Sequence, residues 1–339
     1  MATIAVDAMG GDLAPAEIVR GTVEALQFLP DTQFLLVGDR EALNEQLRHA
    51  GKVEERIRIV HAPHVVSMSE VPVEALKRKP GSSIARAVEL VRSGEADALV
   101  SAGNTGASVA ASYMALGSLR GVRRPGIAVT FHARTQPVVI MDVGANIHCK
   151  PEDLFGYAVM ASLYAEAVLG IGNPRVGLLN IGEEKGKGNA LVQETSKLLQ
   201  RSDLNFVGNV EGDDIFRGTS DVIICDGFVG NIVLKVSEGL SENLFQVFLE
   251  ELASSAGQND AAAVLRDALG RFRRHVDYAE QGGAPLLGIN GVCIVCHGRS
   301  NAWAVTNALR CAVRMLQVDL NQRIERRLAP KSLLGSEVN

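Results

Sequence analysis

The feature that most constrains the fold of this 339-residue chain is a series of short apolar runs, most of which lead into a helical pattern. Each run ends in a turn that contains glycine and a neighbouring Asp or Asn. The runs are residues 4–7, 99–101, 138–142, 176–180 and 222–225. Continuous apolar strands that alternate with helices are typical of a parallel sheet covered on both faces. Ligands of such sheets bind beyond the carboxyl ends of the strands, so we expect these turns to line the functional site.

The pattern predicts an α/β fold built as a single unit over residues 1–339. Only 4% of the residues are aromatic while 34 are glycine, so Ala, Val, Leu and Ile have to form the core. Helical patterns include residues 84–92, 190–199 and 300–326. Ser300 is the expected N-cap of the last helix. Residues 126–142 instead predict two strands joined through 132–136, so we expect the sheet to be mixed.

Several features favour a cytoplasmic protein with reduced cysteines. The N-terminus lacks the basic and apolar regions of a secretory signal, and the five cysteines form no disulfide framework. The haem-attachment pattern CIVCH at residues 293–297 lies in an apolar, strand-like run, so neither haem nor a metal site is expected. Residues 154–172 are the most apolar stretch, but they carry Glu166 and are expected to form a buried helix rather than a membrane span.

Residues 240–278 interrupt the strand rhythm and predict a protruding hairpin of two amphipathic helices, joined by a turn at 257–260. The apolar positions are Leu240, Leu244, Val247, Phe248 and Leu252 in the first helix and Val264, Leu265, Leu269 and Phe272 in the second. The apolar side of such a hairpin needs a partner. We expect the core or a second subunit to cover it, and the alternative is a membrane surface.

The glycine turns at helix N-termini are candidate phosphate sites, because they present backbone N–H groups and the positive end of the helix dipole. None matches the dinucleotide fingerprint or the P-loop, which disfavours nicotinamide and nucleoside triphosphate cofactors. In residues 178–189, Lys185 and Lys187 lie between glycines and could neutralise an anionic substrate or a developing oxyanion. The alternative is a solvated loop.

The turn at residues 226–231 offers a second set of polar groups. Asn231 could donate to an oxyanion while Asp226 orients a neighbour, and the alternative is an Asx-type turn. No Gly-x-Ser-x-Gly elbow or activated cysteine is evident, so a covalent nucleophile is not expected. Three histidines remain candidates for acid–base catalysis or for a structural role: His132, His148 and His297.

Five of these motifs, in order and spacing, resemble one family over nearly the whole chain. They are VDAMGGDLAP at residues 6–15, SAGNTGA at 101–107, DVGAN at 142–146, DGFVGN at 226–231 and GGAPLLG at 282–288. Together they resemble the bacterial phosphate acyltransferases of phospholipid synthesis. The resemblance implies transfer of a long-chain acyl group from acyl carrier protein to inorganic phosphate. A membrane acyltransferase then places the acyl phosphate product on glycerol 3-phosphate.

The resemblance further implies a three-layer α/β/α sandwich, similar to phosphotransacetylases and isocitrate-type dehydrogenases, that works as a homodimer without a cofactor. Lys187 and Asn231 match the residues that the family uses at its active site. The residues expected to line the substrate pocket are Asp7, Gly10, Gly11, Asp12, Gly103, Asn104, Thr105, Gly106, Asp142, Asn146, Asp226, Gly227 and Gly230. Because phosphate is itself a nucleophile, the enzyme needs only to position it and to stabilise the oxyanion. We expect Lys187 to pair with phosphate or the oxyanion and Asn231 to donate to the thioester carbonyl.

The net charge of −5 argues against nucleic acid as a partner, so a docking surface for the acidic carrier protein has to be a local basic patch. One candidate cluster is Arg120, Arg123 and Arg124, and the other is Arg266, Arg271, Arg273 and Arg274. Solvated helix faces are the alternative for both clusters. The hairpin arginines would also suit an anionic membrane surface, and the resemblance implies a cytoplasmic enzyme in loose contact with membrane.

Two other functions remain open at this point. A short-chain phosphotransacetylase that uses a coenzyme A thioester would carry similar phosphate turns. A non-catalytic regulator would bind acyl groups or phosphate without turnover. A decarboxylating dehydrogenase is disfavoured because its metal-binding carboxylates are not evident.

Overall fold

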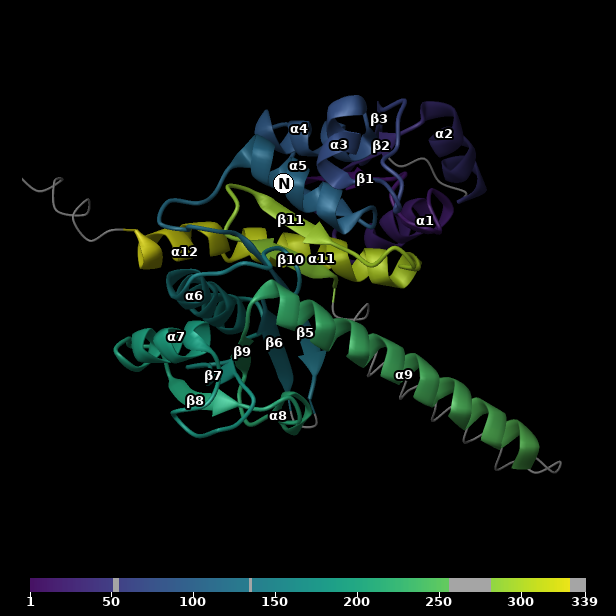
Figure 1. Ribbon diagram of the computed structural model, residues 1–339. Helices are drawn as coiled ribbons and strands as arrows, with labels where there is room; N and C mark the ends of the chain where they lie inside the picture. The colour runs from purple at the N-terminus through teal and green to yellow at the C-terminus, as the bar shows by residue number, and fades with distance from the viewer. Residues whose placement is uncertain (51–54, 134–135, 256–281, 330–339) are drawn as a thin grey trace, which may run out of the picture.

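The computed structural model describes residues 1–50, 55–133, 136–255 and 282–329, arranged around one long sheet (Figure 1). The strands are β1 (Ala2–Asp7), β2 (Thr32–Gly38), β3 (Ile57–His61), β4 (Ala98–Ser101), β5 (Gly126–His132), β6 (Pro137–Met141), β7 (Val176–Leu179), β8 (Phe206–Val210), β9 (Val222–Ile224), β10 (Ala284–Leu287) and β11 (Val292–Val295). The helices are α1 (Ala16–Ala25), α2 (Arg40–His49), α3 (Pro72–Arg78), α4 (Ser83–Arg92), α5 (Thr105–Leu116), α6 (Pro151–Ala167), α7 (Ala190–Gln200), α8 (Asp214–Arg217), α9 (Gly227–Ser255), α11 (Ala302–Gln317) and α12 (Leu320–Leu328).

The sheet is mixed, as the sequence predicts. Its 11 described strands lie in the order β3-β2-β1-β4-β11-β10-β5-β6-β9-β7-β8. Seven neighbouring pairs are parallel and three are antiparallel, and the antiparallel pairs are β11–β10, β10–β5 and β5–β6. The predicted strand pair in residues 126–142 is the β5–β6 hairpin, in which Ala128 pairs with Met141.

Helices cover both faces of the sheet, which confirms the layered α/β class. Strand side chains alternate between the two faces: Ile4 and Val6 lie in one apolar cluster, while Ala5 between them lies in the other. The first cluster packs against α1, α2, α6, α7, α11 and α12, and the second against α3, α4, α5, α8 and the start of α9. The apolar helix expected within residues 154–172 is α6, which is buried in the first cluster.

The three antiparallel pairs reverse the sheet at its middle. The block β3-β2-β1-β4-β11 therefore runs opposite to the block β6-β9-β7-β8. Three strand steps separate β11 from β6, and a sheet twists by roughly 20–25° per strand, so one block is rotated by roughly 60–75° against the other. This rotation offsets part of the reversal between the two blocks.

Two predicted helix boundaries were wrong. The helix expected over 300–326 is broken into α11 and α12 at Asp319, whose φ is +49°. Its N-cap is Asn301 rather than Ser300, because the Asn301 side chain accepts the Ala304 amide at 2.9 Å.

The helix expected to begin at Leu240 begins at Gly227 instead. The Asp226 carboxylate accepts the amides of Phe228 and Val229 and caps the helix 13 residues earlier. α9 then projects away from the sheet (Figure 1). The second predicted hairpin helix, with Arg266, Arg271, Arg273 and Arg274, lies outside the described residues. Among the described helices, none combines the length and hydropathy of a membrane span.

Candidate active site

The turns that follow β1 and β4 pack backbone against backbone. The buried Asp7 carboxylate accepts the Ser101 hydroxyl at 2.7 Å, and Ser101 Oγ accepts the Gly103 amide at 3.1 Å. A Cβ atom at Gly10 would lie 2.7 Å from the Gly103 nitrogen, so only glycine fits there. Burial raises the pKa of Asp7 above its ordinary value. Buried hydrogen bonds and close backbone packing therefore hold this part of the edge together.

Asn104 fixes the start of α5 beside these two turns. Its side-chain oxygen accepts the Ala107 amide at 3.0 Å. Its side-chain nitrogen donates to the carbonyl oxygens of Ser67, Met68 and Glu70, each at 3.2 Å. Thr105 and Gly106, the first two helical residues, are exposed beyond this cap. The start of α5 therefore presents an anchored cap and two exposed backbone positions to the carboxyl edge of the sheet.

The turn after β11 joins the same region. The Gly298 carbonyl oxygen accepts the Asp12 amide at 2.7 Å, which ties the β1 and β11 turns together. His297 Nδ1 accepts the Arg299 amide at 3.2 Å, so Nε2 carries the proton of a neutral imidazole. Nε2 lies 4.0 Å from Glu238 Oε2 on α9. Burial lowers the pKa of His297, while the Glu238 charge opposes that shift.

In the other block, the turn after β6 is organised by Asp142. Its Oδ1 accepts the amides of Ile127, Gly144 and Ala145 at 3.0–3.1 Å, and its Oδ2 accepts the Asn146 amide at 2.8 Å. Burial nevertheless raises the pKa of this carboxyl group. The amides of this turn therefore point inward to a carboxylate of the same chain segment.

The start of α9 lies directly on this turn. The Asn146 carbonyl oxygen accepts the Gly227 amide at 2.8 Å. A Cβ atom at Gly230 would lie 1.9 Å from the Asp142 carbonyl oxygen, so the helix approaches the turn as closely as a backbone can. The Asp226 carboxylate caps the helix by accepting backbone amides. This is the Asx-type hydrogen bonding that the sequence left open as the alternative to a catalytic role for this turn.

The structure places Asn231 and Lys187 on the segments that follow two neighbouring strands, β9 and β7. Asn231 is exposed on the first turn of α9, and a Cβ atom at Gly144 would lie 3.5 Å from its side-chain oxygen. Lys187 is exposed on the loop between β7 and α7, where its carbonyl oxygen accepts the Asn180 side chain at 3.2 Å. β7 and β9 are adjacent, so both segments leave the same edge. Within the described ranges, no hydrogen bond joins the two side chains.

α9 connects the turns of the two blocks. Asn231 near its start faces the β6 turn, whereas Glu238 faces His297 of the β11 turn. Seven residues separate them, about 10 Å along a helix. Lys235 pairs with Glu238 at 2.8 Å, and Arg299 lies 3.5 Å from Glu242. Turns from both blocks therefore converge on the first half of α9.

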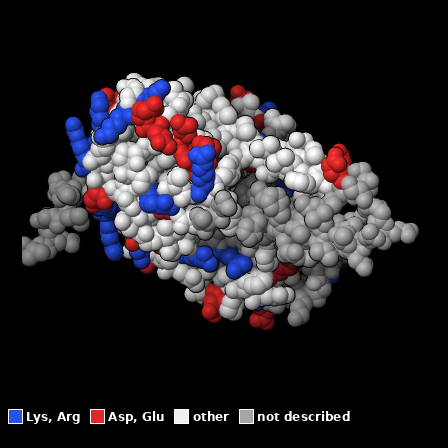
Figure 2. All heavy atoms as spheres, turned by 90° about the horizontal axis from the view of Figure 1, so that it is seen from below, with Lys and Arg blue, Asp and Glu red and all other residues white. Residues whose placement is uncertain are grey.

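The cluster of Arg120, Arg123 and Arg124 does not form one free basic surface. Arg123 pairs with the buried Asp153 at 3.1 Å, while Arg124 donates to the side-chain oxygen of Asn146 at 3.3 Å. On the face shown in Figure 2, basic and acidic side chains are interspersed over the described atoms.

Sequence reasoning missed two groups of this region and gave His297 only as one of three candidate histidines. Ser101 lies in a quoted motif, but its bond to Asp7 depends on two strands 94 residues apart. Tyr157, whose hydroxyl accepts from Asn146 at 2.9 Å, is a single aromatic residue in an apolar helix. Pattern alone could not distinguish these residues from ordinary core positions.

The described residues contain no group of three or more His, Cys, Asp or Glu side chains that could hold a metal ion. Burial raises the pKa of Cys293 to about 11 and that of Cys296 to about 12, so neither is a thiolate near neutral pH.

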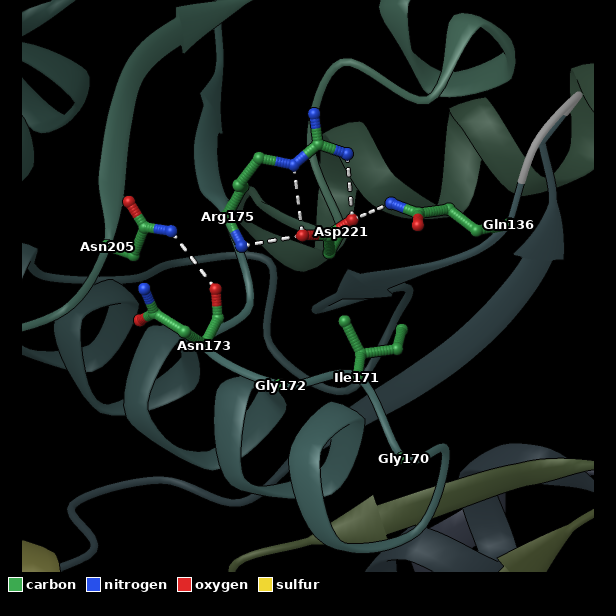
Figure 3. Close-up of a pocket in the computed structure, with 8 residues that line it drawn as sticks. All are labelled: Gln136, Gly170, Ile171, Gly172, Asn173, Arg175, Asn205 and Asp221. Carbon is green, nitrogen blue, oxygen red and sulfur yellow. Dashed lines mark hydrogen bonds and ion pairs between the residues drawn. The ribbon is translucent and has the colours of Figure 1, made fainter.

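A hollow of about 560 Å³ lies at the opposite edge of the second block (Figure 3). Its walls include Gln136, Arg175 and Asp221, which precede β6, β7 and β9. Figure 3 shows the Arg175 guanidinium paired with Asp221, at 2.9 Å. The glycine turns follow the carboxyl ends of the same strands, so this hollow is separate from the candidate active site.

Solved structures share this fold. A phosphotransacetylase from Streptococcus pyogenes aligns with a TM-score of 0.63 over 96% of this chain and 94% of its own, at 17% identity. The EutD phosphotransacetylase from Staphylococcus aureus aligns with a TM-score of 0.60 over 94% of each chain, at 16% identity. The chain thus has the α/β fold of the phosphotransacetylases, as the sequence resemblance implied.

Sequence comparison shows which family within this fold the chain belongs to. The chain is 49% identical to a phosphate acyltransferase from Desulforamulus reducens, over 97% of this chain and 98% of the relative. It is 48% identical to a phosphate acyltransferase from Desulfitobacterium hafniense, over 96% and 97% of the two chains. The family model described as "Fatty acid synthesis protein" matches residues 2–323. The chain belongs to this family and is, like these relatives, an acyltransferase.

Proposed function

We propose that this enzyme transfers a long-chain acyl group from acyl carrier protein to inorganic phosphate, for phospholipid synthesis. The observation that carries the proposal is the 49% identity, over nearly the full length, to a relative named phosphate acyltransferase. The family description, fatty acid synthesis protein, favours a fatty acyl donor. Acyl carrier protein as the donor is our inference from the sequence resemblance.

The reaction requires no covalent enzyme intermediate. A phosphate oxygen attacks the thioester carbonyl carbon, the C–S bond breaks, and the carrier leaves as a thiol after taking up a proton. The protein has to hold phosphate and stabilise the tetrahedral oxyanion. We assign the phosphate or oxyanion contact to Lys187 and the contact with the thioester carbonyl to Asn231. The turns after β1, β4, β6 and β9, at the two ends of this region, line the substrate pocket.

The direct test is incubation with palmitoyl-acyl carrier protein, with and without phosphate. Acyl phosphate is trapped as the hydroxamate, and free carrier is followed in parallel. We expect hydroxamate only with phosphate, in amounts equal to the carrier released. Reaction with acetyl-coenzyme A but not with the carrier would instead establish a short-chain phosphotransacetylase. Binding without either reaction would indicate a regulator.

Lys187→Ala and Asn231→Ala test the residue assignments in the same assay. Each should reduce kcat/KM by about 10²-fold or more, the usual effect of removing one oxyanion donor. Lys197→Ala is the control for Lys187, because Lys197 is exposed on α7 and pairs with the exposed Glu194. Near wild-type turnover of Lys187→Ala at saturating phosphate would refute its assignment.

We further propose that the exposed apolar stripe of α9 is buried against a second copy of the chain. The stripe recurs about every fourth residue and consists of Phe228, Ile232, Val236, Leu240, Leu244 and Phe248. Leu244→Glu should convert a dimer into monomers in light scattering, whereas Asn243→Glu, an exposed polar site beside it, should leave the mass unchanged. A dimeric Leu244→Glu protein would refute this interface.

The carrier-docking surface, Arg266, Arg271, Arg273 and Arg274, remains part of the proposal, as do a cytoplasmic location and loose contact with anionic membrane. These arginines suit an acidic partner. Transfer of the product to a membrane glycerol-3-phosphate acyltransferase would also favour enzyme near the bilayer. Reversing the four charges should raise the KM for the carrier and leave the KM for phosphate unchanged.

A further inference from the structure

The two turns that meet at the start of α9 have few backbone donors left for a ligand. Within residues 143–146, the first amide binds the Ile127 carbonyl oxygen and the other three bind Asp142. The amides of residues 227–230 bind Asn146 and Asp226. A phosphoryl group that binds at these turns therefore has to find its hydrogen bonds on side chains.

Among the described residues, Arg124 is a cation that the fold places on these turns. Its Nη1 donates to the Asn146 side-chain oxygen at 3.3 Å, and the side chain is exposed. Asn146 in turn donates to the Pro125 carbonyl oxygen at 2.6 Å and accepts the Gly227 amide on its own carbonyl oxygen. Arg124 is thus anchored to the residue that joins the β6 turn to α9.

The neighbouring arginine, Arg123, is paired with the buried carboxylate of Asp153 at 3.1 Å, whereas Arg124 is not. Among the described residues, no carboxylate lies within ion-pair distance of Arg124. The acid of the same turn, Asp142, is already satisfied by four amides. The guanidinium is therefore held in place by a neutral amide and keeps its charge and most of its five donors available.

We propose that Arg124 is a phosphoryl-binding residue of this active site. The proposal rests on the phosphate acyltransferase activity proposed above, and it names a residue that binds a phosphoryl group in that reaction. A planar guanidinium can bind two oxygens of one phosphoryl group. Its positive charge can also neutralise that group, whereas the backbone amides of these turns are already hydrogen-bonded within the protein. The phosphoryl group is either the acceptor phosphate or the phosphodiester of the pantetheine arm that carries the acyl thioester.

The test compares Arg124→Ala, Arg124→Lys and the control Arg92→Ala in the full-length enzyme. Arg92 is exposed on α4 and pairs with Glu89, so its loss makes the same change in net charge away from the turns. We expect Arg124→Ala to raise one KM at least tenfold and Arg124→Lys to recover part of it, while Arg92→Ala matches wild type. Thermal denaturation with and without inorganic phosphate provides a second measurement that does not need turnover.

The two possible sources of the phosphoryl group predict different results for Arg124→Ala. A raised KM for phosphate, with loss of the phosphate-induced rise in Tm, assigns Arg124 to the acceptor. A raised KM for palmitoyl-carrier that disappears with S-palmitoyl-pantetheine, which has no phosphoryl group, assigns it to the donor arm. Wild-type KM values in Arg124→Ala would overturn the inference while leaving the acyl transfer intact. An inactive wild-type enzyme would instead contradict the proposed function, and the Tm measurement would still report phosphate binding.

Discussion

Two buried aspartates, Asp7 and Asp142, show how differently single residues can support this edge of the sheet. Asp142 accepts four backbone amides and shapes its own turn. Asp7 instead bonds to the hydroxyl of Ser101 on the neighbouring strand, and burial raises its pKa more than its hydrogen bonds lower it. The sequence predicted both residues as strand-end acids, but it could not predict their partners, because those depend on which strands become neighbours.

The raised pKa of Asp7 predicts how its replacement by Asn changes stability with pH. The unfolded chain releases this proton near pH 3.9, which is a lower pH than the one at which the folded protein releases it. The wild type therefore loses stability as the pH rises from about 4 through the folded-state pKa, whereas Asp7→Asn does not. We expect the Tm of Asp7→Asn, relative to wild type, to increase between pH 4 and pH 7.5.

Asp97→Asn, which removes an exposed carboxylate at the start of β4, controls for net charge in the same pH series. If the Tm difference for Asp7→Asn stays constant with pH, or follows that of Asp97→Asn, the buried carboxylate does not carry the effect.

At the scale of elements, α9 shows why a helix start can escape sequence analysis. The apolar period is clear from Leu240 onward, but the first turns contain Gly227 and Gly230, which disfavour a helix by propensity. Tertiary structure overrides this preference, because Asp226 caps the helix and Gly230 packs on the Asp142 carbonyl oxygen. The contact that requires glycine lies 88 positions away in the chain and cannot be seen in a local pattern.

Replacement of two glycines of α9 by alanine should therefore change the free energy of unfolding in opposite directions. Gly230→Ala should lower the free energy of unfolding by about 1–3 kcal/mol or more, because its Cβ atom would overlap the Asp142 carbonyl oxygen. Gly239→Ala, on the same helix with nothing within 4 Å of the new atom, should raise it by up to about 1 kcal/mol. Urea denaturation measures both, and a stable Gly230→Ala protein would refute the close approach.

At the scale of the whole molecule, local signals predicted the strands, the mixed sheet and the edge that carries the glycine turns. Apolar runs and Gly-Asp turns are encoded within a few residues, so the sequence contains them directly. The reversal of one block against the other is not local, since it depends on β10 pairing with β5 across more than 150 residues of chain. The convergence of both blocks on α9 rests on contacts such as that between Glu238 and His297, 59 positions apart, and a motif scan could not reveal it.

This architecture places the candidate active site and part of the stability of the fold at opposite edges of the second block. Arg175 and Asp221 join the amino ends of β7 and β9 through a pair in which Asp221 is buried and Arg175 is partly exposed. Arg175→Ala leaves the buried carboxylate without its cation. We therefore expect the free energy of unfolding to fall by about 1–3 kcal/mol, a value discounted for the exposure of Arg175.

Because the glycine turns follow the other ends of these strands, the same variant should keep wild-type KM values for phosphate and acyl donor at a temperature well below its Tm. Lys197→Ala, which breaks an exposed ion pair, should change stability by at most about 0.5 kcal/mol and serves as the control. Thermal denaturation and steady-state kinetics on one preparation separate the two effects. A raised KM in folded Arg175→Ala would show that the two edges are coupled through the sheet, because a substitution confined to the amino edge would then alter the site beyond the carboxyl ends.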